Sequence, residues 1–464
     1  MSRYQDQRGI SYTAASQDAV NKFDATINEY VHFSTETGER LKHTLASDPE
    51  FAMAHVLRGA FMQLFCVPAL TEKARQSLAK AREVGAGAEL DARERHHIEA
   101  LDAWITGDLE SALTHWESIL LEHPLDMLAV KLSQFIHFYL GDSRRLRDSI
   151  ARVLPAWQAD IPGHANVLGM YAFGLEESGD YAAAERIGRR AVELDPGDAW
   201  AVHAVAHVME MQDRRRDGIA WLRELEAHWD RVNNFRFHLW WHLALFHLEL
   251  AEYDQVLALY DTAFRAEPTE EYLDICNATS ILWRLEERGV NVAGRWKELA
   301  EISANRIDGH ALIFPDMHFM MAVAAVGDTD STEGMLRSLA QAAGEAGVTE
   351  AGVIEAVGLE LARAIAAWYA GDYESVVDRL LPIRYSFQAI GGSHAQRDLF
   401  HQILIAAALR APRPALARAL LAERAHLKPD NAWTWKRYAE ALDAAGDRAA
   451  AGEAAERARV ALSA

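Results

Sequence analysis

Cysteine is almost absent from this chain, with only Cys66 and Cys276 among 464 residues. Neither lies in a CxxC motif or in a spacing typical of a zinc finger. A scaffold held together by disulfides is therefore excluded, and a reducing compartment is expected.

Long apolar runs are also missing. No stretch of about 18 apolar residues, the length that suggests a membrane-spanning helix, occurs in the sequence. The first residues, MSRYQDQRGISYTAAS, lack the apolar centre of a signal peptide. The sequence therefore predicts a cytoplasmic protein with no membrane partner.

Positive charge is in short supply. The chain has 47 lysines and arginines against 68 aspartates and glutamates, which gives a formal net charge of -21. An acidic excess of this size argues against polyanions as the main partner. We therefore expect no nucleic acid partner.

Common catalytic signatures are missing as well. The sequence contains neither GxSxG nor GxxxxGK[ST], and no GxGxxG follows a strand-like segment. No organic cofactor is therefore predicted. No alternating strand pattern with hairpin turns occurs either, so the chain is predicted to be all-α.

A helical repeat, in contrast, is present. The segment LEESGDYAAAERIGRRAVELDP ends at Pro196 and fits a tetratricopeptide frame of about 34 residues. In this frame Gly179 ends the first helix of a hairpin, Ala184 permits close helix packing, and Pro196 closes the second helix. Similar segments end near Pro124 and Pro268.

The repetition predicts an α-solenoid, a right-handed superhelix of roughly ten to twelve hairpins. We expect one continuous domain over 1–464, with an N-terminal hairpin or cap at 1–50 and a capping helix at 448–464. So many hairpins can curl into a ring-like shape around a central cavity. The ends of such a superhelix also offer surfaces through which two chains could pair.

Histidines gather in the middle of the chain. Six of the 20 histidines lie between positions 203 and 247. His203 and His207 are four residues apart, as are His238 and His242, so each pair shares one helix face. In the repeat frame both pairs fall at positions that line the inner, concave surface. The ordinary alternative is that each histidine is a hydrogen-bonded packing residue.

Three kinds of chemistry fit these histidines. The two pairs and Glu210 could coordinate a divalent metal ion, although position 204 is alanine and no HExxH motif exists. Histidine could instead perform acid–base catalysis near neutral pH. The third option is a binding site lined by histidine and Trp241.

Further candidates lie towards the C-terminus. Asp316 and His318 stand early in a predicted helix, where Asp316 could simply cap the helix. Ser393 and Gln396 form a capping-box pattern after two glycines, and such a helix start, with His394 and Arg397, could receive an anion.

Two arginines stand on largely apolar predicted helices. Arg363 there needs either a carboxylate partner or a ligand. Arg284, next to Trp283, is similar, and its ordinary interpretation is a surface arginine beside a core tryptophan.

Several of these segments together resemble the tetratricopeptide repeat protein 38 family. The segments are WAVHAVAHVMEM, HLWWHLALFHLE, ILWRLE, the DMH at 316–318 and PIRYSFQAIGGSHAQRD. The resemblance covers nearly the whole chain and implies an all-helical repeat protein of soluble compartments. It implies histidine, aspartate and arginine as characteristic residues, in place of the Lys/Asn clamp of chaperone-binding repeats, and it implies no particular reaction.

The sequence thus favours a helical-repeat protein whose concave surface binds a small polar or anionic molecule. Two alternatives remain open: an enzyme for acid–base or metal-assisted hydrolysis or elimination, and a scaffold that binds a peptide. The predicted catalytic residues are His207, His242, Asp316 and His318. The predicted ligand-binding residues are His203, His207, Glu210, His238, Trp241, His242, Asp316, His318, Arg363, His394 and Arg397.

Overall fold

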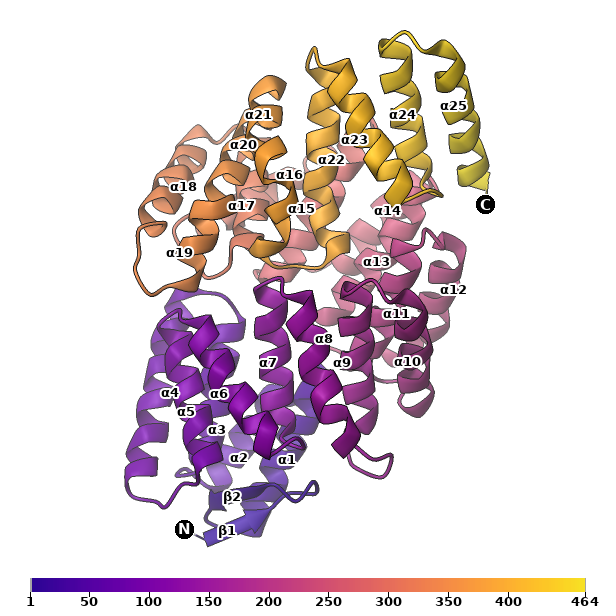
Figure 1. The fold of residues 1–464 in the computed structure, drawn as a ribbon. Coiled ribbons are helices and arrows are strands. Elements are labelled where there is room, and N and C mark those ends of the chain that lie inside the picture. Colours follow the sequence, from indigo (N-terminus) through magenta and orange to yellow (C-terminus); the bar gives the residue numbers. More distant parts are fainter. Residues whose placement is uncertain (1, 464) are drawn as a thin grey trace. The chain divides into compact units, whose positions relative to one another are not determined.

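A computed structural model describes residues 2–463, and helices account for most of them (Figure 1). By contact density the chain divides into two compact units. The first comprises Met1–Val205, Leu225–Arg236 and Glu345–Gly352, and the second comprises Ala206–Glu224, Phe237–Gly344 and Val353–Ala464. The predicted all-α, tetratricopeptide-like class is confirmed, whereas a single continuous superhelix stays a prediction.

The first unit begins with two short strands and continues as successive helices. The elements are β1 (Ser2–Gln5), β2 (Ser11–Ala14), α1 (Gln17–Val31), α2 (Thr37–Ser47), α3 (Ala52–Leu64), α4 (Pro68–Ala86), α5 (Ala92–Ile105), α6 (Leu109–Glu122), α7 (Met127–Tyr139), α8 (Ser143–Val153), the short 3-10 helix η1 (Leu154–Ala156), α9 (His164–Glu177), α10 (Tyr181–Leu194) and the 3-10 helix η2 (Glu226–His228).

Four helices have residues in both units. They are α11 (Ala199–Met211), α12 (Arg215–Leu225), α13 (Phe235–Glu249) and α19 (Thr349–Val353).

The remaining elements belong to the second unit. They are α14 (Tyr253–Leu259), the π-helix η3 (Tyr260–Phe264), α15 (Tyr272–Glu287), α16 (Arg295–Ala304), α17 (Ile313–Ala325), α18 (Thr329–Ala342), the π-helix η4 (Ile354–Gly358), α20 (Leu359–Tyr369), α21 (Tyr373–Ile383), the 3-10 helix η5 (Arg384–Ile390), α22 (His394–Arg410), α23 (Pro414–Leu427), α24 (Ala432–Ala444) and α25 (Arg448–Ser463).

Many turns between paired helices are made by a Gly-Asp dipeptide. In the turn between α9 and α10, Gly179 adopts a left-handed φ of 82°, which glycine reaches without steric cost. Asp180 then caps α10 by accepting a hydrogen bond from the Ala183 amide. The same Gly-Asp turn, with left-handed glycine and capping aspartate, precedes α6, α8, α18, α21 and α25.

The two strands correct the expectation of a chain without strands. β1 and β2 form an antiparallel ribbon in which Tyr4 pairs with Tyr12. Tyr12 is buried and meets Phe23 and Phe51 edge-on, at ring-centre distances of 5.4 and 6.0 Å. Such a ribbon is marginal alone, so its packing against helices stabilises it. The sequence did not predict these strands because each has only four residues, too few to show the alternation of apolar and polar side chains that marks a strand.

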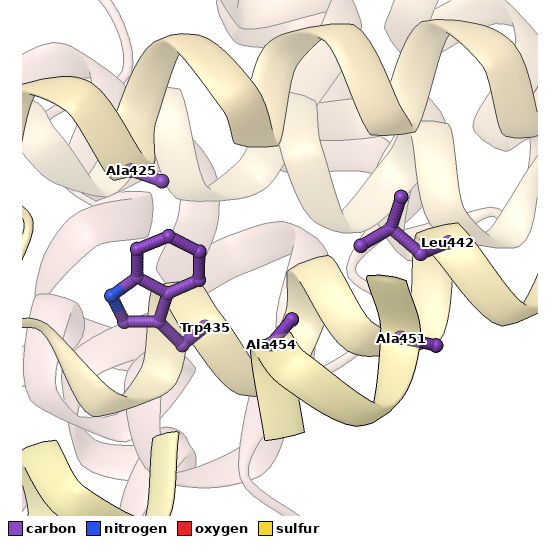
Figure 2. Close-up of a cluster of buried hydrophobic side chains, with 5 residues drawn as sticks. All are labelled: Ala425, Trp435, Leu442, Ala451 and Ala454. Atoms are coloured by element: carbon purple, nitrogen blue, oxygen red, sulfur yellow. The ribbon is translucent and has the colours of Figure 1, made fainter. Parts of the chain in front are cut away.

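The C-terminal hairpin ends in a small apolar cluster. Figure 2 shows Trp435 and Leu442 of α24 with Ala425, Ala451 and Ala454 from the neighbouring helices. The alanines of α25 let this helix pack closely against α24. The predicted capping helix at 448–464 corresponds to α25 as far as Ser463, and Ala464 lies outside the described residues.

Among the helices of residues 2–463, none combines the length and the apolar character needed to cross a bilayer.

Candidate functional site

Four helices carry the candidate site in the second unit. They are α11, α13, α15 and α22. Side-chain hydrogen bonds join α11 to α13 and α13 to α15, and Arg284 on α15 donates to the backbone of α22. Residues far apart in the sequence are thereby brought together, and most of the site side chains are buried.

His238 and His242 stand one turn apart on α13. Their Nε2 atoms are 3.2 Å from each other. His242 Nδ1 lies 2.8 Å from Oε2 of Glu210, and His238 Nδ1 lies 2.9 Å from Oδ1 of Asn277. Each outer nitrogen therefore has an oxygen partner that fixes the orientation of its ring.

His207 on α11 joins this pair. Its ring centre is 4.5 Å from that of His242, and both side chains are fully buried. Burial, together with the neighbouring imidazoles of His242, His238 and His394, holds the pKa of His207 well below its ordinary value. Burial and His242 also lower the pKa of His238. Both side chains are therefore neutral at pH 7.

Trp241 supports the histidines. Its ring stacks on that of His238 at 5.0 Å with an interplanar angle of 15°. Its indole nitrogen donates to Ser280 Oγ over 3.0 Å. The indole thus fixes the distance between α13 and α15.

For Arg284 the ordinary interpretation from the sequence, a surface arginine, is wrong. Arg284 is a buried residue of α15. Its guanidinium donates to the carbonyls of Ser280 (3.2 Å) and Ala395 (3.3 Å). Burial lowers the pKa of Arg284 to about 10, although the carboxylates of Asp398 and Glu210 act in the opposite direction.

The start of α22 has the predicted capping box. The amide of Gln396 donates to Ser393 Oγ, and the amide of Ser393 donates to Gln396 Oε1, which confirms that prediction. Arg397 is buried and donates to the carbonyls of Gly391 and Gly392. His394 is the first residue of the helix, so this end of α22 carries two potential cationic groups.

Asp316 and His318 lie on α17, each in a local hydrogen bond. His310 Nδ1 donates to Asp316 Oδ2 over 2.7 Å, and Asp316 does not cap its helix. His318 Nδ1 donates to the Phe314 carbonyl. Burial, with a smaller contribution from Arg284, lowers the pKa of His318 to about 4. The charge of Arg284 on α15 thus acts on the pKa of His318 on α17.

Arg363 lies outside the helices that carry the site. The side chain of Arg363 is 41% exposed and pairs with Glu360. Of the two predicted partners, a carboxylate or a ligand, Arg363 therefore has the carboxylate. His203 precedes His207 by four residues on α11 and belongs to the first unit. There its ring contacts Phe173, Trp200 and Phe235.

Two site residues of α15, Asn277 and Ser280, were not predicted from the sequence. Asn277, Ser280 and Arg284 share one face of this helix, because they are spaced three and four residues apart. Polar residues repeated on one face of an otherwise apolar helix were the available signal. Their partners on α13 and α22 were not readable from the sequence.

Several solved structures are similar to this chain at low sequence identity. No family model matches the chain. Human IFIT1, solved as a dimer with PPP-AAAA, is 14% identical, with 97% of this chain and 96% of that one covered at a TM-score of 0.41. Naa15/Naa10 bound to HypK-THB is 12% identical over 94% of this chain and 68% of that one, at a TM-score of 0.26. The P58(IPK) TPR domain is 14% identical, with 80% and 99% covered at a TM-score of 0.22.

These comparisons correct the expectation about nucleic acid. Human IFIT1 is solved with PPP-AAAA and with m7Gppp-AAAA. The exclusion of a nucleic acid partner from the net charge of -21 is therefore wrong. The physical reason is that net charge sums over the whole surface, whereas a ligand responds to the local field of its binding site.

Proposed function

We propose that this chain is a helical-repeat binding protein that holds a small anionic molecule between α11, α13, α15 and α22. The observation that carries the proposal is the buried guanidinium of Arg284. Among the described residues, no carboxylate lies within ion-pair distance of Arg284, and its hydrogen bonds go to two backbone carbonyls. A buried charge without a counter-ion costs several kcal/mol, which a bound anion would offset.

The carboxylates nearest to Arg284 are engaged elsewhere. Both terminal nitrogens of Arg424 donate hydrogen bonds to the Asp398 carboxylate, and the side-chain amide of Gln402 donates another. Glu210 accepts from His242. Arg284 therefore keeps a buried positive charge that neither carboxylate pairs with directly. Because the lining side chains are buried, the ligand that fits is small.

The sequence segments that carry the family resemblance support the same site. They fall on α11, α13, α15 and α17, and on the stretch from the end of α21 through η5 to the start of α22. We propose on this basis that the chain is a relative of the tetratricopeptide repeat protein 38 family, with a cytoplasmic location. No specific observation favours the catalytic or the peptide-binding alternative, and both stay predictions.

Phosphate binding tests the proposal. Inorganic phosphate should raise the unfolding temperature of the intact chain, because a ligand that binds only the folded state stabilises it. The increase should vanish in Arg284→Met and should persist in Arg363→Met, the matched control with an exposed arginine. Arg284→Lys, which keeps the charge, covers the case in which Arg284→Met does not fold. An equal phosphate response in the wild type and in Arg284→Met would contradict the proposal, as would no response in the wild type.

A further inference from the structure

His207, His238 and His242 form a compact group that we call the three-histidine cluster. The side chains are at most 3% exposed, and they come from α11 and α13. One ring nitrogen of each lies within 4.8 Å of the corresponding nitrogen of the other two. Three donor atoms are thus directed into one small volume.

Hydrogen bonding determines which nitrogens carry protons. A carboxylate oxygen only accepts, so Nδ1 of His242 must donate to Glu210. The side-chain carbonyl of Asn277 also accepts, so Nδ1 of His238 must donate to it. When each imidazole carries a single proton, its lone pair is therefore at Nε2.

The two Nε2 atoms consequently present lone pairs to each other across 3.2 Å. This arrangement is repulsive unless a cation lies between them. A metal ion coordinated by both Nε2 atoms removes this repulsion. In a tetrahedral zinc site, with Zn–N bonds of about 2.0–2.1 Å, the ligand nitrogens are about 3.3 Å apart.

We propose that His207, His238 and His242 bind one divalent transition metal ion of the zinc type. Imidazole nitrogen suits zinc, nickel and copper, whereas magnesium and calcium require oxygen ligands. Glu210 and Asn277 are positioning residues, which orient the two α13 imidazoles from behind. These three histidines are the ligands that the second unit contributes, and any contact between the metal ion and the small anion rests on the proposed function.

Glu210 therefore has a different role from the one first predicted for it. The sequence suggested Glu210 as a ligand of the metal. In the structure its carboxylate accepts from Nδ1 of His242, on the side of the ring away from His238. Such a contact fixes the tautomer and raises the basicity of the ligating nitrogen.

Metal titration of the intact chain tests this site. After treatment with a chelator, the wild type should bind one equivalent of zinc by calorimetry. With Co²⁺ it should give the strong visible absorption of a tetrahedral site. His242→Gln should lose at least about 100-fold in zinc affinity, and Glu210→Gln about 10-fold, the range known for residues behind a ligand. His137→Gln is the matched control, since His137 is equally buried and also contacts a carboxylate, that of Glu117.

The outcomes separate this inference from the proposed function. No stoichiometric zinc in the wild type, or unchanged affinity in a folded His238→Gln/His242→Gln double variant, would overturn the metal site. Phosphate binding by the metal-free chain would in that case leave the proposed function intact. Zinc uptake without any phosphate response would support the metal site and contradict the anion proposal. Circular dichroism establishes folding, and the Co²⁺ spectrum of the wild type decides the question if the double variant does not fold.

Discussion

The ammonium nitrogen of Lys131 lies 4.4 Å from the ring centre of Trp200. The rings of Phe33 and Phe135 are at 4.5 and 4.7 Å, so three aromatic faces surround a fully buried charge. Cation–π attraction is strongest when the cation is desolvated. Even so, burial lowers the pKa of Lys131 to about 7, although Asp198 acts in the opposite direction.

Lys131→Met should therefore change the pH dependence of stability. The folded pKa is below the ordinary value of 10.5, so between about 7 and 10.5 the unfolded chain binds more protons than the folded one. The unfolding free energy of the wild type should rise with pH in that window. Lys131→Met should lack this rise, and Lys42→Met, at an exposed position, should keep it. Urea unfolding across the window measures the effect, and parallel curves for the wild type and Lys131→Met would contradict it.

Asp126→Asn should destabilise the first unit strongly. Asp126 accepts from Arg93 (2.6 Å) and contacts His97 (3.1 Å), and all three are buried. Removing one partner leaves Arg93 buried without its counter-charge, which costs about 3–5 kcal/mol. Asp108→Asn is the control, because Asp108 only caps α6 and its loss costs about 1 kcal/mol or less. Chemical denaturation at neutral pH compares the two, and equal losses would contradict the prediction.

The same carboxyl should contribute to acid sensitivity. Although burial acts in the opposite direction, His97 and Arg93 hold the pKa of Asp126 well below its ordinary value of 3.8. The stability from ionised Asp126 is therefore complete above 3.8 and is lost as the pH falls through the folded pKa. We expect the wild type to lose unfolding free energy in this acid range, and Asp126→Asn to lose less. A steeper loss in the variant would refute this.

Gly218→Ala should disturb the contact between α12 and α13. A Cβ atom at Gly218 would lie 2.3 Å from the ring of Phe246, which is buried in the core. Such overpacking costs about 1–3 kcal/mol. The matched change Gly452→Ala, on α25, meets open space and should be neutral or stabilising by up to about 1 kcal/mol. Thermal unfolding distinguishes them, and a neutral Gly218→Ala would show that Phe246 moves aside freely.

Removing α25 should make the chain self-associate. The deletion of 448–464 uncovers Trp435 and Leu442, which pack against Ala451 and Ala454 (Figure 2). Terminal repeats protect the apolar surface of the repeat beneath them. Light scattering of the truncated chain should show aggregation that Leu442→Lys, introduced into the truncated chain, reduces. A truncated chain that stays monomeric would argue against a capping role.

Much of the local structure was readable from the sequence because it depends on neighbours along the chain. The Gly-Asp dipeptides marked turns such as Gly179–Asp180, since left-handed backbone and side-chain capping are local properties. The spacing of His238 and His242 placed both on one helix face for the same reason. The ribbon of β1 and β2 was missed, because its pairing is stabilised by packing on Phe23 and Phe51.

The sequence by itself determined the helical-repeat class, the turns and the histidine pairs. Only the tertiary structure decided that Asn277 and Glu210 contact the outer nitrogens of His238 and His242, and that Arg284 is buried. It also decided that Arg363, equally plausible in the sequence, pairs with Glu360 at the surface. The physical reason is that helix periodicity determines from nearby sequence alone which residues share one face of the same helix. The partner on another helix depends on how distant segments pack, and that packing sets burial, protonation and charge at the site.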